Sequence, residues 1–446
     1  MKLSAKPLSE AKKATTTKSK AENNTLKKSK IKTASRVERC VIKETDDFFP
    51  VIMDYCHKSK NLYNHANYVI RQSFTQKDEN GNNIGKYIIY KEIDKILKAD
   101  LEYPDYKDMP TAQSAQQTLK ILDKNWKSFF KSIKDYKKNP KKYLGRPKLP
   151  KFLPKEGYFV LVFTNQNCKL KADKLIHFPK VFGNFFMSVK FVYREDFHSF
   201  QQVRILPRKN KLIIEFIYKI KLIDKQKNNQ RYIGIDLGVN NLATVCNNID
   251  ETPFIINGKP IKSYNQYYNK KLAYYKSKLE KRNKQKTSKR IRSLTEKRNL
   301  KINDYLHKAS RKIVNFCREH LISAIVIGKN KNWKQKAKMS DKNNQNFVQI
   351  PFARFIQLIQ YKAEECGIEV ITTEESYTSG TSFVDDENPV KENYDKKRRK
   401  HRGLFITNSG IEINADLNGA YQILKKAFPI KWDRGCRLHP KVAVLA

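Results

Sequence analysis

The sequence predicts a multidomain α+β protein with a helical domain, a β-rich domain and a mixed α/β domain. The length of 446 residues leaves room for about three domains of ~150 residues each. Between residues 45 and 137 the apolar residues recur at helical spacing, whereas β-branched and aromatic runs alternate with turns between 158 and 222. From Tyr232 onward, strand-like and helix-like segments alternate.

The composition indicates a folded protein that binds a polyanion. Lys and Arg number 91 and Asp and Glu number 44, which gives a formal net charge of +47 spread along the chain. Self-repulsion of this size destabilises a compact state unless a partner neutralises it, and nucleic-acid phosphates neutralise many charges at once. An enzyme acting on small molecules does not need such a surface. We therefore expect a nucleic-acid-binding protein.

Residues 1–36 are predicted to form a disordered basic tail. Lys, Ser, Thr, Ala and Asn dominate there, and no aromatic residue precedes Phe48, so the segment has little with which to build a core. Its lysine clusters fit a nuclear-import signal, a nucleic-acid-binding arm or a merely solvated tail, and the sequence leaves all three open.

Neither a membrane contact nor a disulfide framework is expected. No apolar run approaches the ~18 residues of a membrane span, and the N-terminus lacks the apolar core of a secretory signal, so an intracellular protein is predicted. The seven cysteines are scattered and contain no C-x-x-C pair, which is typical of reduced core thiols. Cys436 and His439 supply only half of a zinc-site spacing, so no zinc is expected.

The helical domain is predicted to interrupt a β-barrel. Residues 37–42 have a strand pattern, and helical spacing follows from 45 to 137. Proline and glycine between 140 and 154 end the last helix, and the short apolar runs that follow predict a sheet or small barrel.

The last part, 231–446, has the element order β-β-β-α-β-α-β-α, which resembles a ribonuclease H-like fold. The first three strands should form an antiparallel meander. The helical stretch that follows is intensely basic and should form two paired helices. The expected segments are strands at 232–238, 242–246, 254–256, 323–327 and 369–372, helices at 264–320, at 350–366 and from about Asp416, and a basic insertion at 391–402.

Acidic residues from three separate segments are the candidate catalytic groups. Asp236 lies in an otherwise apolar strand, where an ionised carboxylate requires cations or hydrogen bonds; the alternative is that it faces solvent on an edge strand. Asp416 begins a helix, where it could also serve only the helix dipole. Glu374 and Glu375 end a strand and point to opposite faces, so only one can join a shared site, and both could be exposed strand-end acids.

Three carboxylates on a basic α/β scaffold fit two-metal phosphodiester hydrolysis. One metal ion activates the attacking water and the second supports the leaving oxygen. Mg²⁺ suits an all-oxygen ligand set and keeps several waters. We therefore predict two Mg²⁺ ions held by Asp236, Asp416 and one of the two adjacent glutamates, Glu374 or Glu375.

Several ordered motifs resemble the RuvC domain of TnpB, the transposon-encoded RNA-guided nuclease, and of its Fanzor relatives. Residues 111–130 are similar to the recognition-lobe helix of that family and 145–152 to its linker into the wedge domain, so the likeness covers about 37–430. The RuvC-like motifs are Gly234–Val239, Lys329-Asn330, Gln345–Phe347, Glu375–Ser379 and Asn414–Ala420.

The resemblance implies domain roles and an activity. Residues 37–44 and 138–230 would be the wedge β-barrel, 45–137 the recognition domain and 231–446 the RuvC nuclease domain. The expected activity is RNA-guided cleavage of double-stranded DNA beside a short target-adjacent motif. The expected partners are an omega-type guide RNA from the element's flank and the target DNA, with one protein copy per ribonucleoprotein. The basic tail favours Fanzor and hence the nucleus; a bacterial TnpB would be cytoplasmic.

Two departures from the family pattern matter. The second acid of the common pattern would stand at Gly328. The resemblance is therefore to a subgroup in which that acid moves to the Glu-Ser-Tyr-Thr-Ser motif, which assigns the role to Glu375, with Glu374 as second choice. Where the family often has two C-x-x-C pairs, 381–413 contains none, so a degenerate, zinc-free target-nucleic-acid-binding insertion is expected. The alternatives are a catalytically inactive RNA-guided repressor and a guide-independent ribonuclease H-like transposase.

Further polar residues are candidates for contact with nucleic acid, since amide and phenol groups can read base edges and basic groups bind phosphates. Solvated helix faces or loops are the alternative for each. The candidates are Tyr63, Asn67, Gln113, Gln116 and Gln117 in the helical domain, Lys329, Asn330 and Lys334 after the fourth strand, and Arg398, Arg399, Lys400 and Arg402 in the basic insertion.

Overall fold

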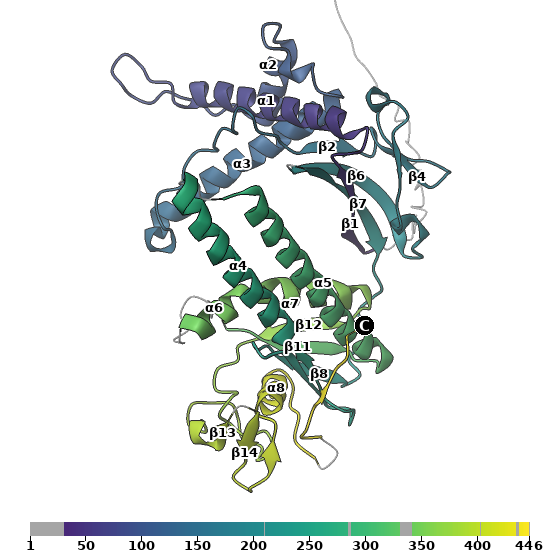
Figure 1. Ribbon diagram of the computed structural model, residues 1–446, viewed down its shortest axis with the longest axis vertical. Helices are drawn as coiled ribbons and strands as arrows, with labels where there is room; N and C mark the ends of the chain where they lie inside the picture. Colours follow the sequence, from purple (N-terminus) through teal and green to yellow (C-terminus); the bar gives the residue numbers. More distant parts are fainter. Residues whose placement is uncertain are drawn as a thin grey trace, which may run out of the picture. The chain divides into compact units, whose positions relative to one another are not determined.

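A computed structural model describes most of the chain (Figure 1). The described residues are 31–208, 210–283, 287–330, 341–401, 403–433 and 437–445; side chains are also left out at 281–283 and 341–343. Most of the predicted tail, Lys334, Arg402 and Cys436 lie outside these ranges. Of the helices that the structure describes, none is long and apolar enough to cross a membrane.

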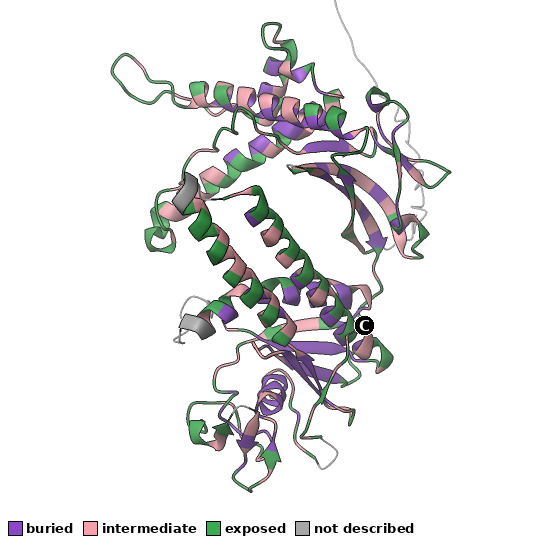
Figure 2. Ribbon diagram, in the orientation of Figure 1, coloured by how far each residue is buried: buried purple, intermediate pink, exposed green. Residues whose placement is uncertain are grey.

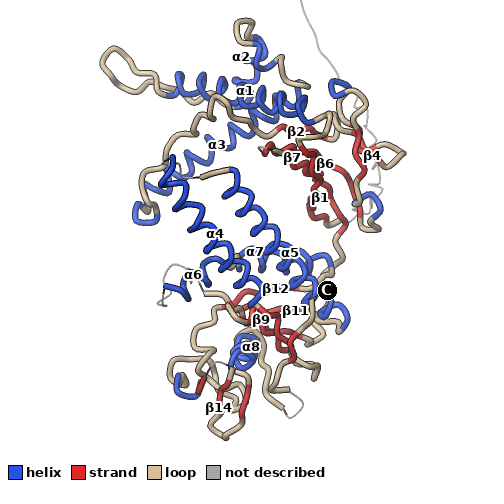
Figure 3. The backbone as a smooth tube through the Cα atoms, viewed as in Figure 1, coloured by secondary structure: helices blue, strands red, loops and turns tan. Residues whose placement is uncertain are grey.

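The N-terminal β-rich part consists of two antiparallel sheets (Figures 1 and 3). The larger has the order β1 (Thr33–Lys43), β7 (Lys211–Lys221), β6 (Phe197–Arg208) and β2 (Leu161–Thr164). The smaller joins β3 (Lys169–Leu170), β4 (Leu175–His177) and β5 (Phe186–Ser188). The ladders between the described strands do not close into one ring, so the predicted barrel takes an open, two-sheet form. Strand β1 starts at Thr33, so the last residues of the predicted tail belong to the sheet.

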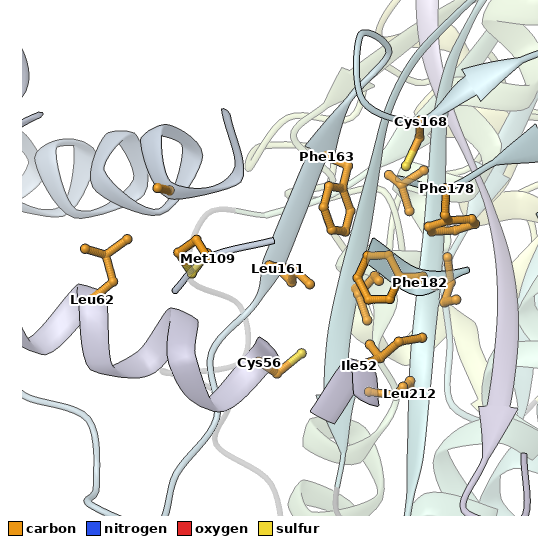
Figure 4. Close-up of a cluster of buried hydrophobic side chains, with 14 of the residues drawn as sticks. Ile52, Cys56, Leu62, Met109, Leu161, Phe163, Cys168, Phe178, Phe182 and Leu212 are labelled. Carbon is orange, nitrogen blue, oxygen red and sulfur yellow. The ribbon is translucent and has the colours of Figure 1, made fainter. Parts of the chain in front are cut away.

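Three helices pack against the larger sheet and share one core with it. They are α1 (Phe49–Phe74), α2 (Tyr90–Ala99) and α3 (Ala112–Lys138). The Thr111 side chain caps α3 by accepting a hydrogen bond from the Ser114 amide, and the Ser114 hydroxyl accepts one from the Thr111 amide. Both bonds satisfy backbone donors that are otherwise free at the start of a helix. Figure 4 shows part of this core, in which Ile52 and Cys56 of α1 join Leu161 of β2 and Leu212 of β7.

The C-terminal part is built on a six-stranded mixed sheet. Its order is β12 (Glu369–Thr373), β11 (Ala324–Gly328), β8 (Tyr232–Asp236), β9 (Asn241–Asn247), β10 (Phe254–Asn257) and β16 (Lys441–Val442). The first three chain segments form the predicted antiparallel meander, and β11 and β12 add in parallel beside β8. The short strand β16, which the sequence pattern did not predict, pairs in parallel with β10.

Helices cover both faces of this sheet. On one face α5 (Lys289–Glu319) and α7 (Phe352–Glu365) pack on Ile233, Ile235 and their neighbours; on the other, α8 (Ala415–Lys425) packs on Tyr232 and Val326. The basic stretch after the meander forms the expected helix pair, α4 (Lys259–Asn283) with α5, and α6 (Asp341–Gln349) precedes α7. Figure 2 shows α8 and the central strands as buried and most of α4 as exposed or half-buried.

The basic insertion has its own small sheet. Strands β13 (Arg399–His401), β14 (Leu404–Ile406) and β15 (Glu412–Ile413) pair antiparallel, and Phe405 and Ile413 join the core beneath α8. The insertion is therefore anchored on the α8 face of the main sheet.

Candidate active site

Asp236 lies at the carboxyl end of β8, on the face covered by α8. Side chains alternate along a strand, so Asp236 shares a face with Tyr232 and Gly234. Gly234 lets α8 come close: a Cβ there would lie 2.5 Å from the Ala420 carbonyl oxygen. The same approach brings the Asp236 carboxylate against the helix, with Oδ2 3.4 Å from where a Cβ on Gly419 would stand.

Asp416 lies in the first turn of α8. Asn414 caps the helix, because its Oδ1 accepts from the Asp416 and Leu417 amides at 3.1 Å each. The Asp416 carboxylate accepts from Asn241 Nδ2 at 2.8 Å and from the Arg399 guanidinium at 2.7 Å. Strand β9, helix α8 and the basic insertion thus meet at one carboxylate.

Glu375 follows β12 and fills the space left by a glycine. A Cβ on Gly328 would lie 3.0 Å from Glu375 Oε2. Asn330 holds the glutamate twice: its Oδ1 accepts from the Glu375 amide at 3.1 Å, and its Nδ2 donates to Oε1 at 3.3 Å. The other oxygen, Oε2, is buried without a hydrogen-bond partner. The Glu375 carboxylate therefore lies beside the position that a side chain on residue 328 would occupy.

Glu374 points elsewhere. Its side chain is exposed and accepts from the Ser376 hydroxyl at 2.7 Å. The alternation of side chains at the end of β12 separates the two glutamates, as expected. The structure thus brings Asp236, Glu375 and Asp416 together around one cavity and leaves Glu374 outside it.

This cavity has a volume of about 900 Å³ and concentrates negative charge. Burial, then the nearby Asp416 and Glu375 carboxylates, raise the pKa of Asp236 to about 8, against the lowering effect of Arg399 and the Leu237 amide. Burial also raises the pKa of Glu375 to about 7, although Lys426 lowers it. A cation in the cavity would relieve both groups.

The side chains fit a metal ion by donor type, and their present arrangement is open. Among the described residues, no three His, Cys, Asp or Glu side chains are close enough to hold one metal ion. Asp416 is instead engaged by Arg399. Among the described residues, Glu375 Oε2 has no hydrogen-bond partner, and the Asp416 and Glu375 carboxylates repel a charge on Asp236. Both features fit a site that binds a cation through oxygen ligands.

Sequence reasoning missed three features of the cavity. Asn241 holds Asp416, and no charge or spacing pattern signals that role. Tyr377 lines the cavity with φ +67°, a backbone conformation that non-glycine residues rarely adopt and that clusters at functional sites. Lys426, whose Nζ donates to the Ser376 carbonyl at 2.7 Å, places a positive charge near Glu375.

Two predicted base-reading residues of the helical domain have structural contacts instead. Asn67 is fully buried: it accepts from Trp126 Nε1 at 3.1 Å and donates to the Pro150 carbonyl at 3.0 Å. Tyr63 is only 4% exposed and accepts from Asn125 at 3.2 Å. Both lie on the core side of α1, so the base-reading prediction for them gives way to a packing role.

The glutamines of α3 lie nearer the surface. Gln113 is half-buried, accepts from Thr164 Oγ1 at 2.5 Å and also bonds to Gln166. Gln116 and Gln117 are half-buried on the same helix. A base-reading role for these three stays a prediction.

The nucleic-acid-binding candidates near the cavity differ in whether their side chains are exposed or bound to other residues of the chain. Lys329 and Lys400 are exposed, and Asn330 positions Glu375. Arg399 pairs with Asp416. Arg398 is bound inside the insertion by Glu387, so its predicted role in nucleic-acid contact gives way to a structural one.

Comparison with known proteins relates the chain to a family. Residues 215–334 match the OrfB_IS605 family model, described as a probable transposase, and 352–423 match a Cas12f1-like TNB domain. The TnpB-like protein ORF457 of Acidianus two-tailed virus is 27% identical over 417 residues, or 83% of this chain and 81% of that protein. The cryo-EM structure of a Cas12f1–sgRNA–target DNA complex shares the fold with a TM-score of 0.52 and 16% identity, over 84% of this chain and 82% of that one. The likeness confirms the predicted fold class.

Proposed function

We propose that this chain, a relative of the TnpB and OrfB_IS605 probable transposases, is an RNA-guided DNA endonuclease of the RuvC type. The observation that carries the proposal is the convergence of Asp236, Glu375 and Asp416 on one cavity from three separate segments. The Cas12f1 chain that shares its fold was solved with sgRNA and target DNA, and the net charge of +47 suits the same partners. Base pairing with the guide would choose the target, and the protein would read a short adjacent duplex motif.

The three carboxylates would hold two Mg²⁺ ions. These ions would supply an activated water and stabilise the leaving oxygen. The chain's own groups prepare that site: Asn330 fixes the Glu375 backbone and carboxylate, and Asn241 and Arg399 hold Asp416. Arg399, which donates one hydrogen bond to Asp416, could instead donate to a phosphate oxygen, because guanidinium binds carboxylates and phosphates alike.

Two other functions remain candidates, each for a specific reason. Gly328 removes the common second acid, which would leave a guided DNA-binding repressor if Glu375 did not serve. The placement of Glu375 Oε2 beside Gly328 favours the nuclease. The probable-transposase description of 215–334 keeps a guide-independent transposase as the second candidate. Affiliation with Fanzor, nuclear localisation and a monomeric ribonucleoprotein stay predictions.

The deciding experiment is to co-express the chain with its flanking genomic DNA and sequence the RNA that stays bound after a high-salt wash. The complex is then incubated with a DNA library of randomised flanks and Mg²⁺. We expect one abundant RNA from the gene's edge and cleavage beside a short motif. Specific RNA without cleavage would indicate the guided repressor, and heterogeneous RNA would overturn guided recognition.

Glu375→Gln and Glu374→Gln form a matched pair for the relocated acid. Both replace adjacent glutamates with the isosteric amide, but only Glu375 lines the cavity. We expect Glu375→Gln to abolish cleavage while guide and target binding persist, and Glu374→Gln to cleave normally. The reverse result would assign the role to Glu374.

A further inference from the structure

A second groove, lined by tyrosines and basic residues, runs between α4 and α5. Its volume is about 550 Å³, and its lining includes Tyr264, Tyr267, Tyr268 and Tyr275 of α4 together with Arg290 and Lys301 of α5. Cations lie over the rings: the Arg290 guanidinium is 4.8 Å from the Tyr275 centroid, and Lys301 Nζ is 5.3 Å from that of Tyr264. The residues described as lining it include no carboxylate.

This combination fits single-stranded nucleic acid. Aromatic rings stack on unpaired bases of any identity, while neighbouring Lys and Arg bind the phosphates. Tyr264 and Tyr268, which lie four residues apart on α4, are separated by ~6 Å along the helix axis, at 1.5 Å rise per residue. This exceeds the 3.4 Å step between stacked bases in a duplex. The spacing therefore suits bases that are splayed apart, one to a ring.

The first turns of α4 contribute to both cavities. Lys262, near the start of α4, lines the acid cavity and donates to Asn240 Oδ1 at 3.3 Å. The next residues, Ser263 and Tyr264, line the tyrosine groove. The same helix therefore borders the site of the proposed reaction and the tyrosine groove.

We propose that the tyrosine groove binds the single DNA strand that enters or leaves the acid cavity, with its bases stacked on the α4 tyrosines. The inference rests on the proposed function, because it assigns the groove to that reaction's substrate. Because α4 lines both the groove and the acid cavity, we favour the DNA strand over the guide RNA as the occupant. A DNA duplex would keep its bases stacked on each other and away from the rings.

Tyr267 and Tyr274 provide a matched test on one helix. Tyr267 is 60% exposed and lines the groove, whereas Tyr274 is 51% exposed and lies outside it. Each has a lysine over its ring, at 6.0 Å and 4.6 Å respectively. Losing one stacking platform should weaken binding of a fluorescent oligodeoxythymidine to the full chain roughly 5- to 150-fold in Tyr267→Ala. Tyr274→Ala should bind within about 2-fold of the parent, since it removes no groove ring.

Binding is measured by fluorescence anisotropy in EDTA, so hydrolysis plays no part. A 5-iododeoxyuridine oligonucleotide, photocrosslinked and mapped by mass spectrometry, should label the α4 tyrosines of the groove. Equal losses in the two variants, or crosslinks confined to other elements, would overturn the inference. A loss seen with single-stranded RNA or duplex DNA but not with single-stranded DNA would also overturn it.

The two proposals fail separately. Groove binding with a Tyr267-dependent affinity but no cleavage in Mg²⁺ would support the groove and overturn the nuclease. Cleavage that is lost in Glu375→Gln but unchanged in Tyr267→Ala, with anisotropy also unchanged, would support the nuclease and overturn the groove.

Discussion

Two polar clusters in the C-terminal part of the chain contain carboxylates with little exposure to solvent. The clusters differ in how completely these carboxylates are hydrogen-bonded. In the acid cavity, Glu375 Oε2 is buried without a partner, and the pKa of Asp236 is raised to about 8. In the insertion, Glu387 accepts from the Arg398 guanidinium at 2.7 and 2.8 Å and from the Ser382 amide at 2.7 Å. Burial alone would raise the pKa of Asp385, but hydrogen bonds from the Asn408 amide and the Ser409 hydroxyl lower it.

The difference in hydrogen bonding distinguishes a cluster that can bind a ligand from a cluster that stabilises the fold. Carboxylates whose hydrogen bonds are complete stabilise the fold and need nothing more. Carboxylates that lie close together with incomplete hydrogen bonding lower the stability of the fold. Such an arrangement is retained where a bound ligand compensates for that loss. In the insertion, Ser382, Asp385 and Glu387 are linked by hydrogen bonds to each other or to Asn408, in the turn between β14 and β15. The following predictions test whether the two clusters respond oppositely to loss of charge.

Asp236→Asn should produce the largest effect on activity. Removing the central carboxylate should lower cleavage on the order of 10³-fold or more. Thermal stability in EDTA should stay constant or rise, because repulsion with Asp416 and Glu375 is relieved. Cleavage by the guide-loaded protein and melting temperature are measured in parallel. Asp304→Asn, an exposed ion-pair acid on α5, is the control and should change neither quantity. Full cleavage by Asp236→Asn would remove this residue from the site.

Glu387→Gln should destabilise the fold and leave the chemistry of the acid cavity intact. The side chains of Glu387 and Arg398 are 16% and 11% exposed, so the substitution leaves a nearly buried guanidinium uncompensated. We expect a loss of about 3 kcal/mol in the free energy of unfolding, the lower end for broken buried pairs. Denaturant midpoints measure it, and exposed Glu392→Gln is the control. A loss no larger than that of the control would contradict a structural role for the cluster.

The same contrast explains how far sequence reasoning reached. The strand meander, the paired basic helices and the convergence of three carboxylates follow from patterns that each element carries locally. The opposite directions of Glu374 and Glu375 also followed from side-chain alternation at a strand end, whereas the choice of Glu375 came from the family resemblance. The sequence patterns did not predict that the N-terminal strands form two open sheets and not a closed barrel. Closure of a barrel depends on pairing between strands that are distant in the sequence.

Individual polar contacts were the least predictable feature. Asn67 is polar, as surface residues usually are, but helix packing places its side chain in the core, where it accepts a hydrogen bond from Trp126. Arg398 and Arg399 are neighbours in a basic run, yet one pairs with Glu387 and the other with Asp416. Such partners come from separate segments, so no local pattern encodes them. Asn241 was not predicted for the same reason, and Asn330 was predicted to contact nucleic acid but not to hold Glu375.

Asn330→Ala should reduce cleavage less than loss of an acid. The amide orients Glu375 through two hydrogen bonds, and loss of such an outer partner typically costs 10–100-fold in metal affinity or activity. Raising Mg²⁺ should recover part of the activity if positioning is the defect. Neighbouring Lys329→Ala, an exposed side chain, is the matched control and should not respond to Mg²⁺ in this way. Equal effects of the two variants would contradict the positioning role of Asn330.

The pH dependence of stability should show the smallest effect and the clearest opposition between the clusters. In EDTA, the raised pKa values of Asp236, about 8, and Glu375, about 7, mean that the folded state binds protons more tightly than the unfolded state. Stability is therefore full below the ordinary carboxyl values of 3.8 and 4.5 and falls as pH rises toward 8. The expected result is a fall in the denaturant midpoint as the pH is raised from about 4 to 8 in EDTA. Asp236→Asn and Glu375→Gln should each flatten it, and Glu374→Gln should not. The lowered pKa of Asp385 acts in the opposite sense, adding stability that is lost only as pH falls below its ordinary value. A stability that rises between pH 5 and 8 in EDTA would show that the acid cavity is not repulsive in the folded protein.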